Sequence, residues 1–249
     1  MTSITAASLA AAAERLRGHL VATPLIGTPW LHRTSLPDVR WKPELLQPGG
    51  SAWWRGYQHF LLRQLGRCAG LVYAGPPERL LAAALAAMQH RLPLHALLLD
   101  DCPPALRQLL PPEVTLECRV PPAAVAAVAR RSGFTILPDE RDAEVQHGLA
   151  TVACELADGL PQHCELVFAP ADLQQALAAG LAAAGRPLTV ASPGADVRVL
   201  PQLREAVAHG HGIALGDGSL RVLSAALAAA SSSCVGAVLA DAAPDGAAD

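Results

Sequence analysis

The sequence of 249 residues is most notable for a near absence of lysine, because Lys42 is the only one. A phosphate-binding loop of the G-x-x-x-x-G-K-(S/T) type is therefore excluded. There is also no large excess of either charge, since the formal net charge is −3 at pH 7. This balance gives no electrostatic basis for binding nucleic acid or an anionic membrane surface.

The chain also lacks cysteine pairs and long apolar segments. No two of its six cysteines have the C-x-x-C spacing of a zinc or redox site, so we expect buried free thiols. No run reaches the roughly 18 uncharged apolar residues of a membrane span. The first 20 residues have no basic start and are typical of an amphipathic helix rather than a signal peptide. We therefore expect a cytoplasmic protein with reduced cysteines.

Other site signatures are weak. His209 and His211 have no third ligand close to them in the sequence, which indicates a surface turn, and we expect no metal site. No G-x-S-x-G nucleophile elbow is present.

What the chain does contain is a regular alternation of short apolar runs and alanine-rich runs. Strands are predicted at 70–74, 94–99, 114–119, 135–137, 165–169 and 188–191. Helices are predicted at 8–20, 52–65, 77–90, 103–109, 122–132, 140–158, 173–184, 201–208 and 219–230. This alternation favours an α/β fold whose largely parallel sheets are covered by helices on both faces.

Several segments, in order, resemble the threonine/serine dehydratase group of fold-type II pyridoxal-phosphate (PLP) enzymes. The run WKPELLQPGGSAWWRG is similar, without gaps, to the family pattern L-K-x-E-x-x-Q-x-T-G-S-F-K-x-R-G. LVYAGPPE lies where the family has a strand and S-x-G-N-H, and HGLATVACEL resembles its G-Q-G-T-x-x-x-E helix. ELVFAPADLQQALAAG lies where the family has its phosphate loop, and GDGSLRVLSAAL resembles its late glycine-rich helix.

The resemblance implies the two-lobed, tryptophan synthase beta-like architecture, in which each lobe is a three-layer αβα arrangement around a parallel sheet. We expect residues 52–138 to form the small lobe, and residues 1–51 with 139–249 to form the large lobe. A family segment is missing between Val197 and Pro201, so we expect a shortened large lobe.

The same resemblance places the Schiff-base lysine of the family at Trp53, whose indole cannot form an imine. Lys42 corresponds to a strand lysine eleven residues earlier, and we expect its ammonium to lie in solvent. Trp53, with Trp54, is expected to fill the space that the cofactor occupies in the family. An alternative interpretation is that the two indoles form a platform for a ligand.

The other cofactor contacts of the family are also replaced. Its ring-binding asparagine corresponds to Pro76, which has no side-chain donor. Its glycine-rich phosphate cradle corresponds to Pro170, Ala171, Asp172 and Leu173. Asp172 is expected to cap the following helix with its carboxylate, so an anion already occupies the phosphate position. The family's late S-G-G-N run is absent from residues 235–242, and Cys234 is not expected in the site. We therefore expect no bound PLP.

Some positions keep the residue of the family pattern. They are Ser51, Arg55, Gly148 and Thr151. We expect structural roles, with Arg55 and Gly56 fixing the turn and helix start, and Gly148 and Thr151 fixing the packing between the lobes. Ser51 and Arg55 could also line a cleft with the two tryptophans. His147 is expected to cap a helix or to lie on the surface.

Three functions remain open on the sequence. The first, which we favour, is a non-catalytic homologue (a pseudoenzyme) that associates with itself or with an active homologue, because the family commonly forms dimers. The second is a small-molecule binding protein or a PLP-independent enzyme that uses the remodelled cleft. The third is a PLP-dependent ammonia-lyase with an unorthodox site, which would need a lysine other than the usual one or a non-covalent mode of cofactor binding.

Overall fold

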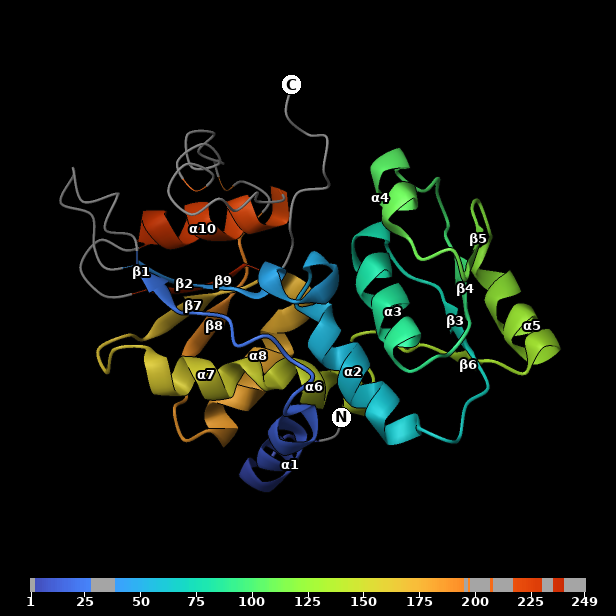
Figure 1. The fold of residues 1–249 in the computed structure, drawn as a ribbon. Helices are drawn as coiled ribbons and strands as arrows, with labels where there is room; N and C mark the ends of the chain where they lie inside the picture. Colours follow the sequence, from blue (N-terminus) through green and yellow to red (C-terminus); the bar gives the residue numbers. More distant parts are fainter. Residues whose placement is uncertain are drawn as a thin grey trace.

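The computed structural model describes residues 3–27, 39–194, 197, 207, 217–229 and 235–239. These residues form two β-sheets with helices on both faces of each (Figure 1). The strand order is β1-β2-β9-β7-β8 in the five-stranded sheet and β5-β4-β3-β6 in the four-stranded sheet. The predicted α/β fold class is confirmed.

The five-stranded sheet draws its strands from distant parts of the chain. They are β1 (Ile26–Gly27), β2 (Val39–Pro43), β7 (Leu166–Phe168), β8 (Thr189–Ala191) and β9 (Val235–Leu239). All pairs are parallel except β1 with β2. One face is covered by α10 (Asp217–Ala229), and the other by α7 (Val152–Gly159) and α8 (Ala171–Ala183) (Figure 1).

The four-stranded sheet is wholly parallel and comes from one continuous stretch of chain. Its strands are β3 (Leu71–Tyr73), β4 (Leu94–Leu97), β5 (Val114–Glu117) and β6 (Thr135–Ile136). The helices α3 (Pro77–Gln89) and α5 (Pro122–Ser132) lie on opposite faces, and α4 (Pro104–Leu109) connects β4 to β5 (Figure 1). Proline at the first turn of all three helices fits the fixed φ of that residue.

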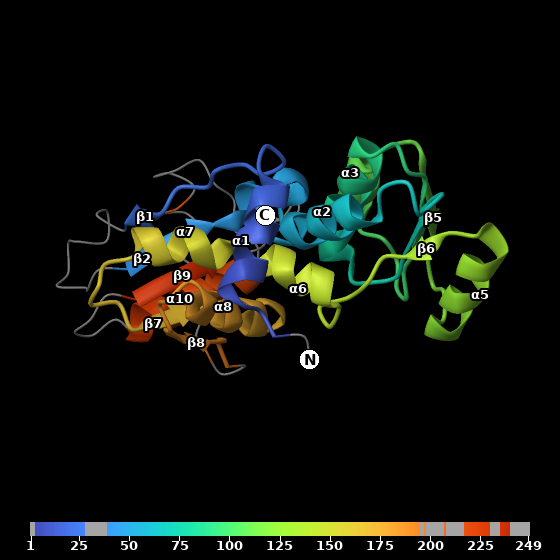
Figure 2. The same cartoon turned by 90° about the horizontal axis from the view of Figure 1, so that it is seen from below.

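Three helices join the two sheets. They are α1 (Ala6–Leu16), α2 (Trp53–Gln64) and α6 (Ala143–Ala150). In both views α2 lies between the two sheets and crosses α6 (Figures 1 and 2). At this crossing a Cβ added to Gly148 would lie only 2.4 Å from the Arg55 carbonyl oxygen, so the helices are closer than any other residue would allow.

A tight turn leads from β2 into α2 through two short 3-10 helices, η2 (Glu44–Leu46) and η3 (Pro48–Gly50). Gly49 has a φ of 76°, and a Cβ there would lie 2.5 Å from the Ala82 nitrogen of α3. The glycine therefore serves both the turn and the contact with α3. It lets the turn that precedes Trp53 pack directly on a helix of the other sheet.

All six predicted strands correspond to observed strands, whereas β1 and β9 were not predicted and β2 was predicted only at its Lys42 end. The single helix predicted at 140–158 is two helices, because α6 ends at Ala150 and α7 begins at Val152. The predicted helix at 201–208 and the missing segment after Val197 fall almost entirely outside the described residues. The four-stranded sheet lies within 52–138, but the lobe boundaries themselves stay a prediction.

Within the described part of the chain, no helix is both long and apolar enough to cross a membrane.

Candidate functional site

Charged residues in the segment that runs from β2 into α2 form a buried network. Glu44 accepts two hydrogen bonds from the guanidinium of Arg55, at 2.7 Å from Nε and 2.9 Å from Nη2. Lys42 Nζ donates to the Thr23 carbonyl oxygen and to Glu155 Oε2, each at 2.5 Å. The Lys42 side chain is 1% exposed, so the expectation that its ammonium lies in solvent was wrong. A β2 side chain at this position is covered by α7 and by the segment before β1.

Opposite charges in this network stabilise one another. Burial alone would raise the pKa of Glu44, but Arg55 and Lys42 outweigh it and hold that pKa below its usual value. Burial alone would lower the pKa of Arg55, but Glu44 and Glu155 raise it. Arg55 Nη1 lies 2.7 Å from Glu155 Oε1, so two edges of the guanidinium each have a carboxylate partner. Two cations and two anions are thus neutralised where β2, α2 and α7 meet.

Other positions of the family pattern support the same network. Ser51 Oγ accepts a hydrogen bond from the Trp53 amide at 3.3 Å, at the start of α2. Thr151 Oγ1 donates to the Gly148 carbonyl at 2.7 Å and accepts from Arg55 Nη1 at 3.3 Å. Their role in the structure is therefore to hold the backbone and the Arg55 side chain. That of Arg55 extends well beyond the turn, because it also connects α2 to η2 and α7.

Trp53 lies at the centre of a second cluster, which we call the Trp53 cluster and define as Trp53, Tyr57, Arg79, Glu140 and Asp172. The indole Nε1 donates to Asp172 Oδ2 at 2.9 Å, and the Arg79 guanidinium lies 3.7 Å from the ring centroid. Arg79 also pairs with Asp172 at 2.9 Å and with Glu140 at 3.0 Å. Only 1% of Trp53 is exposed. The indole is therefore held on its face and at its polar atom.

Tyrosine rings continue this packing from Trp53 to the loop after β3. The ring centroids of Trp53 and Tyr57 are 5.4 Å apart, and Tyr57 meets Tyr73 edge to face at 6.5 Å. Burial raises the pKa of both phenols, so both stay protonated at neutral pH. The Tyr73 hydroxyl donates to the Pro76 carbonyl, and a Cβ added to Gly75 would lie 2.7 Å from that hydroxyl. The loop is thus filled by a side chain of its own strand.

The start of α8 differs from the prediction. The N-cap is Pro170, with no side-chain cap, and Asp172 is in the first turn with its carboxylate turned to Trp53 and Arg79. The predicted capping box at Asp172 was therefore wrong, because these two donors hold the carboxylate instead. The predicted negative charge does lie in the first turn, where the helix dipole favours it. Leu173 is buried in the core.

The two tryptophans do not form one surface. Trp54 Nε1 donates to the His19 carbonyl at 2.8 Å, toward the segment after α1, whereas Trp53 bonds to α8. A shared ligand platform therefore has no support in the geometry. His147 was also placed wrongly, because it lies inside α6 and joins the Ala143 carbonyl to Ser8 Oγ.

The remaining candidates from the sequence are one cysteine and a pair of histidines. Cys234, His209 and His211 lie outside the described residues, and 235–239 form β9. Among the residues that the structure describes, no group of three or more His, Cys, Asp or Glu side chains could hold a metal ion.

Sequence reasoning missed Arg79 and Glu140 as members of the Trp53 cluster. Arg79 follows the G-P-P loop by two residues, so its position at the start of α3 was readable, but its distant partners were not. Tyr57, one turn after Trp53 on α2, carried a readable helical-spacing signal.

Comparison with solved structures identifies chains with the same fold. A pyridoxal 5′-phosphate-dependent aspartate racemase matches with a TM-score of 0.81 and 16% identity over 97% of this chain and 96% of that one. Serine racemase from Dictyostelium discoideum matches with a TM-score of 0.78 and 14% identity over 97% of this chain and 99% of that one. Threonine deaminase isoform 2 from Solanum lycopersicum matches with a TM-score of 0.73 and 14% identity over 97% of this chain and 86% of that one. At these identities the likeness shows the fold, which confirms the fold-type II resemblance at that level.

Comparison with protein-family models and with curated protein sequences gives no match.

The residues around Trp53 do not fit PLP. Indole stands at the position that the resemblance gives to the Schiff-base lysine, and Lys42 is engaged with Thr23 and Glu155. The start of α8, which corresponds to the phosphate cradle, carries the Asp172 carboxylate and begins after a proline without an N–H. The arrangement therefore supplies neither a free amine nor an anion site for the cofactor.

Proposed function

Starting from a fold shared with PLP-dependent racemases and deaminases, we propose that this chain is a non-catalytic homologue, a pseudoenzyme, of the threonine/serine dehydratases. The observation that carries the proposal is the Trp53 indole, held by Asp172 and covered by Arg79. A ring held at its edge and its face does not leave the space that a cofactor needs. In this proposal the site has changed from a reaction centre into a packed contact between α2, α3 and α8.

We further propose that the protein acts by association, either as a dimer with itself or with an active homologue. Large apolar side chains at the surface support this: Val21 is 44% exposed and Leu46 is 39% exposed. Both adjoin Gln47, whose side-chain amide exchanges two hydrogen bonds with the Val21 backbone. Apolar groups held on an ordered backbone suit a protein contact better than mobile ones do. A cytoplasmic location is part of the proposal, supported by the free thiols of all five described cysteines.

The cofactor part is tested by incubating the purified protein with PLP, reducing it with borohydride and measuring the intact mass. We expect no imine absorbance and no added mass. The Lys42→Arg variant is the matched control, because it leaves the α-amino group as the only primary amine. An adduct that is present in the native protein and lost in Lys42→Arg would contradict the proposal. Ammonia release from serine and threonine would then be assayed.

The association part is tested separately by light scattering after size-exclusion chromatography. The chain is measured alone and after mixing with an active dehydratase from the same cell. We expect a mass above that of the 25.8 kDa monomer in at least one of the two samples. Monomers in both samples would reject association while leaving the loss of the cofactor site intact.

A further inference from the structure

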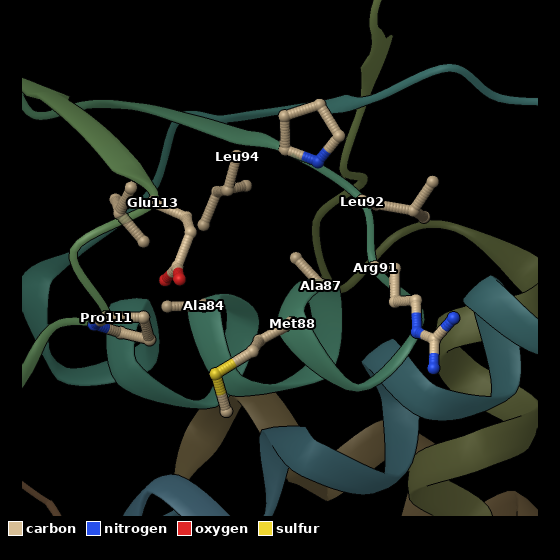
Figure 3. Close-up of a pocket in the computed structure, with 10 residues that line it drawn as sticks. Ala84, Ala87, Met88, Arg91, Leu92, Leu94, Pro111 and Glu113 are labelled. Atoms are coloured by element: carbon tan, nitrogen blue, oxygen red, sulfur yellow. The ribbon is translucent and has the colours of Figure 1, made fainter.

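A cavity of about 430 Å3 opens beside the last turns of α3 and shares no residue with the Trp53 cluster. One wall is formed by Ala84, Ala87 and Met88 of α3. The opposite wall contains Leu94, the first residue of β4, and Pro111, which precedes β5 (Figure 3). Its size lies in the range of about 300–1,000 Å3 that is usual for small-molecule sites. The small alanine side chains create the space between the helix and the sheet.

The two charged side chains that line this cavity, Glu113 and Arg91, point in different directions. The Glu113 carboxylate points into the cavity toward α3, whereas the Arg91 side chain points away from its centre (Figure 3). Within the described residues, the Glu113 carboxylate has no hydrogen bond or ion pair, and neither has the Arg91 guanidinium. Both residues are exposed, so the Glu113 carboxylate is solvated and lies at the mouth of the cavity, beside its apolar walls.

The end of α3 adds to this negative character. The helix ends at Gln89 and has no basic residue in its last turn. Ala87 and Met88, which line the cavity, belong to that turn. Their carbonyls already accept from the backbone N–H groups of His90, Arg91 and Leu92, so the helix end favours a cation only through its dipole. A cationic ligand would add an ion pair with the exposed Glu113 carboxylate that a neutral ligand of the same shape could not make. A ligand anion would be repelled by it.

We propose that this cavity binds an organic ammonium ion with an apolar body, of the arylalkylamine class. The ammonium would pair with Glu113, and the apolar body would cover Ala84, Ala87 and Leu94. The proposal concerns a different part of the chain from the Trp53 cluster, so neither proposal depends on the other.

Met88 provides a direct reporter of binding. The chain has two methionines, Met1 and Met88, so a sample labelled with ¹³C at the methionine methyl groups gives at most two signals. The Met88→Leu variant assigns the signal of the cavity. On titration with 2-phenylethylamine we expect a saturable shift of that signal. In Glu113→Gln, loss of the ion pair should weaken the affinity about two- to fivefold, as expected for a pair at an exposed carboxylate.

Two controls distinguish this site from general binding. Glu165→Gln removes a carboxylate of the same kind from an exposed position outside the cavity, and it should keep the affinity of the unmodified protein. The neutral analogue 2-phenylethanol should bind more weakly than the amine. The proposal is overturned if the Met88 signal does not shift saturably, if Glu113→Gln binds the amine unchanged, or if the alcohol binds as tightly.

Discussion

At the scale of single residues, the segment that runs from β2 into α2 contains two kinds of residue with different roles. Lys42, Glu44 and Arg55 keep the family's residue types and are buried in a neutral network of charges. Trp53, the first residue of α2, stands at the position that the resemblance gives to the Schiff-base lysine. The sequence indicated which positions keep the family's residue types, but not that the charged ones are buried together. It could not place Lys42 in the interior, because its partners Thr23 and Glu155 lie 19 and 113 residues away in the chain.

The hydrogen bond from Trp53 to Asp172 should contribute measurably to stability. Trp53→Phe keeps a ring beside Tyr57 but removes the Nε1 donor, so we expect a loss of about 1–2 kcal/mol in the free energy of unfolding. Urea unfolding of Trp53→Phe, Asp172→Ala and the double variant measures the coupling of the pair. Additive effects of the two substitutions would mean that the bond contributes nothing.

His59 should make the protein less stable in mild acid. Its Nδ1 lies 2.8 Å from the Glu144 carbonyl, which only accepts, and its Nε2 lies 2.9 Å from Arg15 Nη1, which only donates. The ring is therefore neutral with the proton on Nδ1, and a second proton would point at Arg15. Burial lowers the pKa of His59, although the carbonyl and carboxylate of Glu144 act in the opposite direction.

The sign of the pH effect follows from that lowered pKa. Between the folded pKa and the ordinary histidine value of about 6.5, the unfolded chain binds more protons, so stability falls as pH falls, by at most about 1.4 kcal/mol per pH unit for one group. Urea unfolding at several pH values between 7.5 and 5 should show a smaller slope in His59→Gln. Exposed His163, changed to Gln, is the control and should leave the slope unchanged. Part of the slope should remain in His59→Gln, because burial and His19 also lower the pKa of His90. An unchanged slope in His59→Gln would contradict the prediction.

At the scale of elements, the central feature is the crossing of α2 and α6, which connects the two sheets. The resemblance pointed to Gly148 and Thr151 as packing positions. In the structure Gly148 lies at the crossing, and Thr151, just after α6, accepts a hydrogen bond from Arg55 of α2. The break between α6 and α7 was not readable, because the stretch has uninterrupted helical periodicity. Strand β9 was missed because a short run of small and apolar residues around Gly236 does not distinguish a strand from a helix or a loop. Its identity as a strand comes from β2 and β7 on either side.

Gly148→Ala should be strongly destabilising. The new Cβ would lie 2.4 Å from the Arg55 carbonyl oxygen and 2.8 Å from the Gly56 Cα, and both are backbone atoms that cannot rotate away. Overpacking usually costs about 1–3 kcal/mol, and we expect the upper end because α2 must move as a whole. Thermal unfolding followed by circular dichroism measures the loss. In Gly159→Ala, the control, the added Cβ meets only a Leu25 side chain at 3.1 Å, so a much smaller effect is expected. Equal effects would show that the crossing is not tight.

At the scale of the whole molecule, the sequence predicted an α/β fold with helices on both faces of parallel sheets because that pattern is local and repeats along the chain. The composition of the Trp53 cluster was not predictable in the same way. Arg79, Glu140 and Asp172 come from three segments whose only relation is the way the two sheets meet. The family pattern identified Trp53 and Asp172 as replaced positions but gave no indication that the two would bond to each other.

The single lysine makes the opening of the whole molecule measurable. Lys42 is 1% exposed and is held by Thr23 from the segment before β1 and by Glu155 from α7. An acylating N-hydroxysuccinimide ester should therefore modify only the α-amino group of the native protein, and a second acyl group should appear in the intact mass only as the chain unfolds. Glu155→Gln removes one charged partner of Lys42 and should speed the second modification. Native Lys42 reacting as fast as the α-amino group would show an accessible amine, which is one of the features that a PLP-dependent function would require.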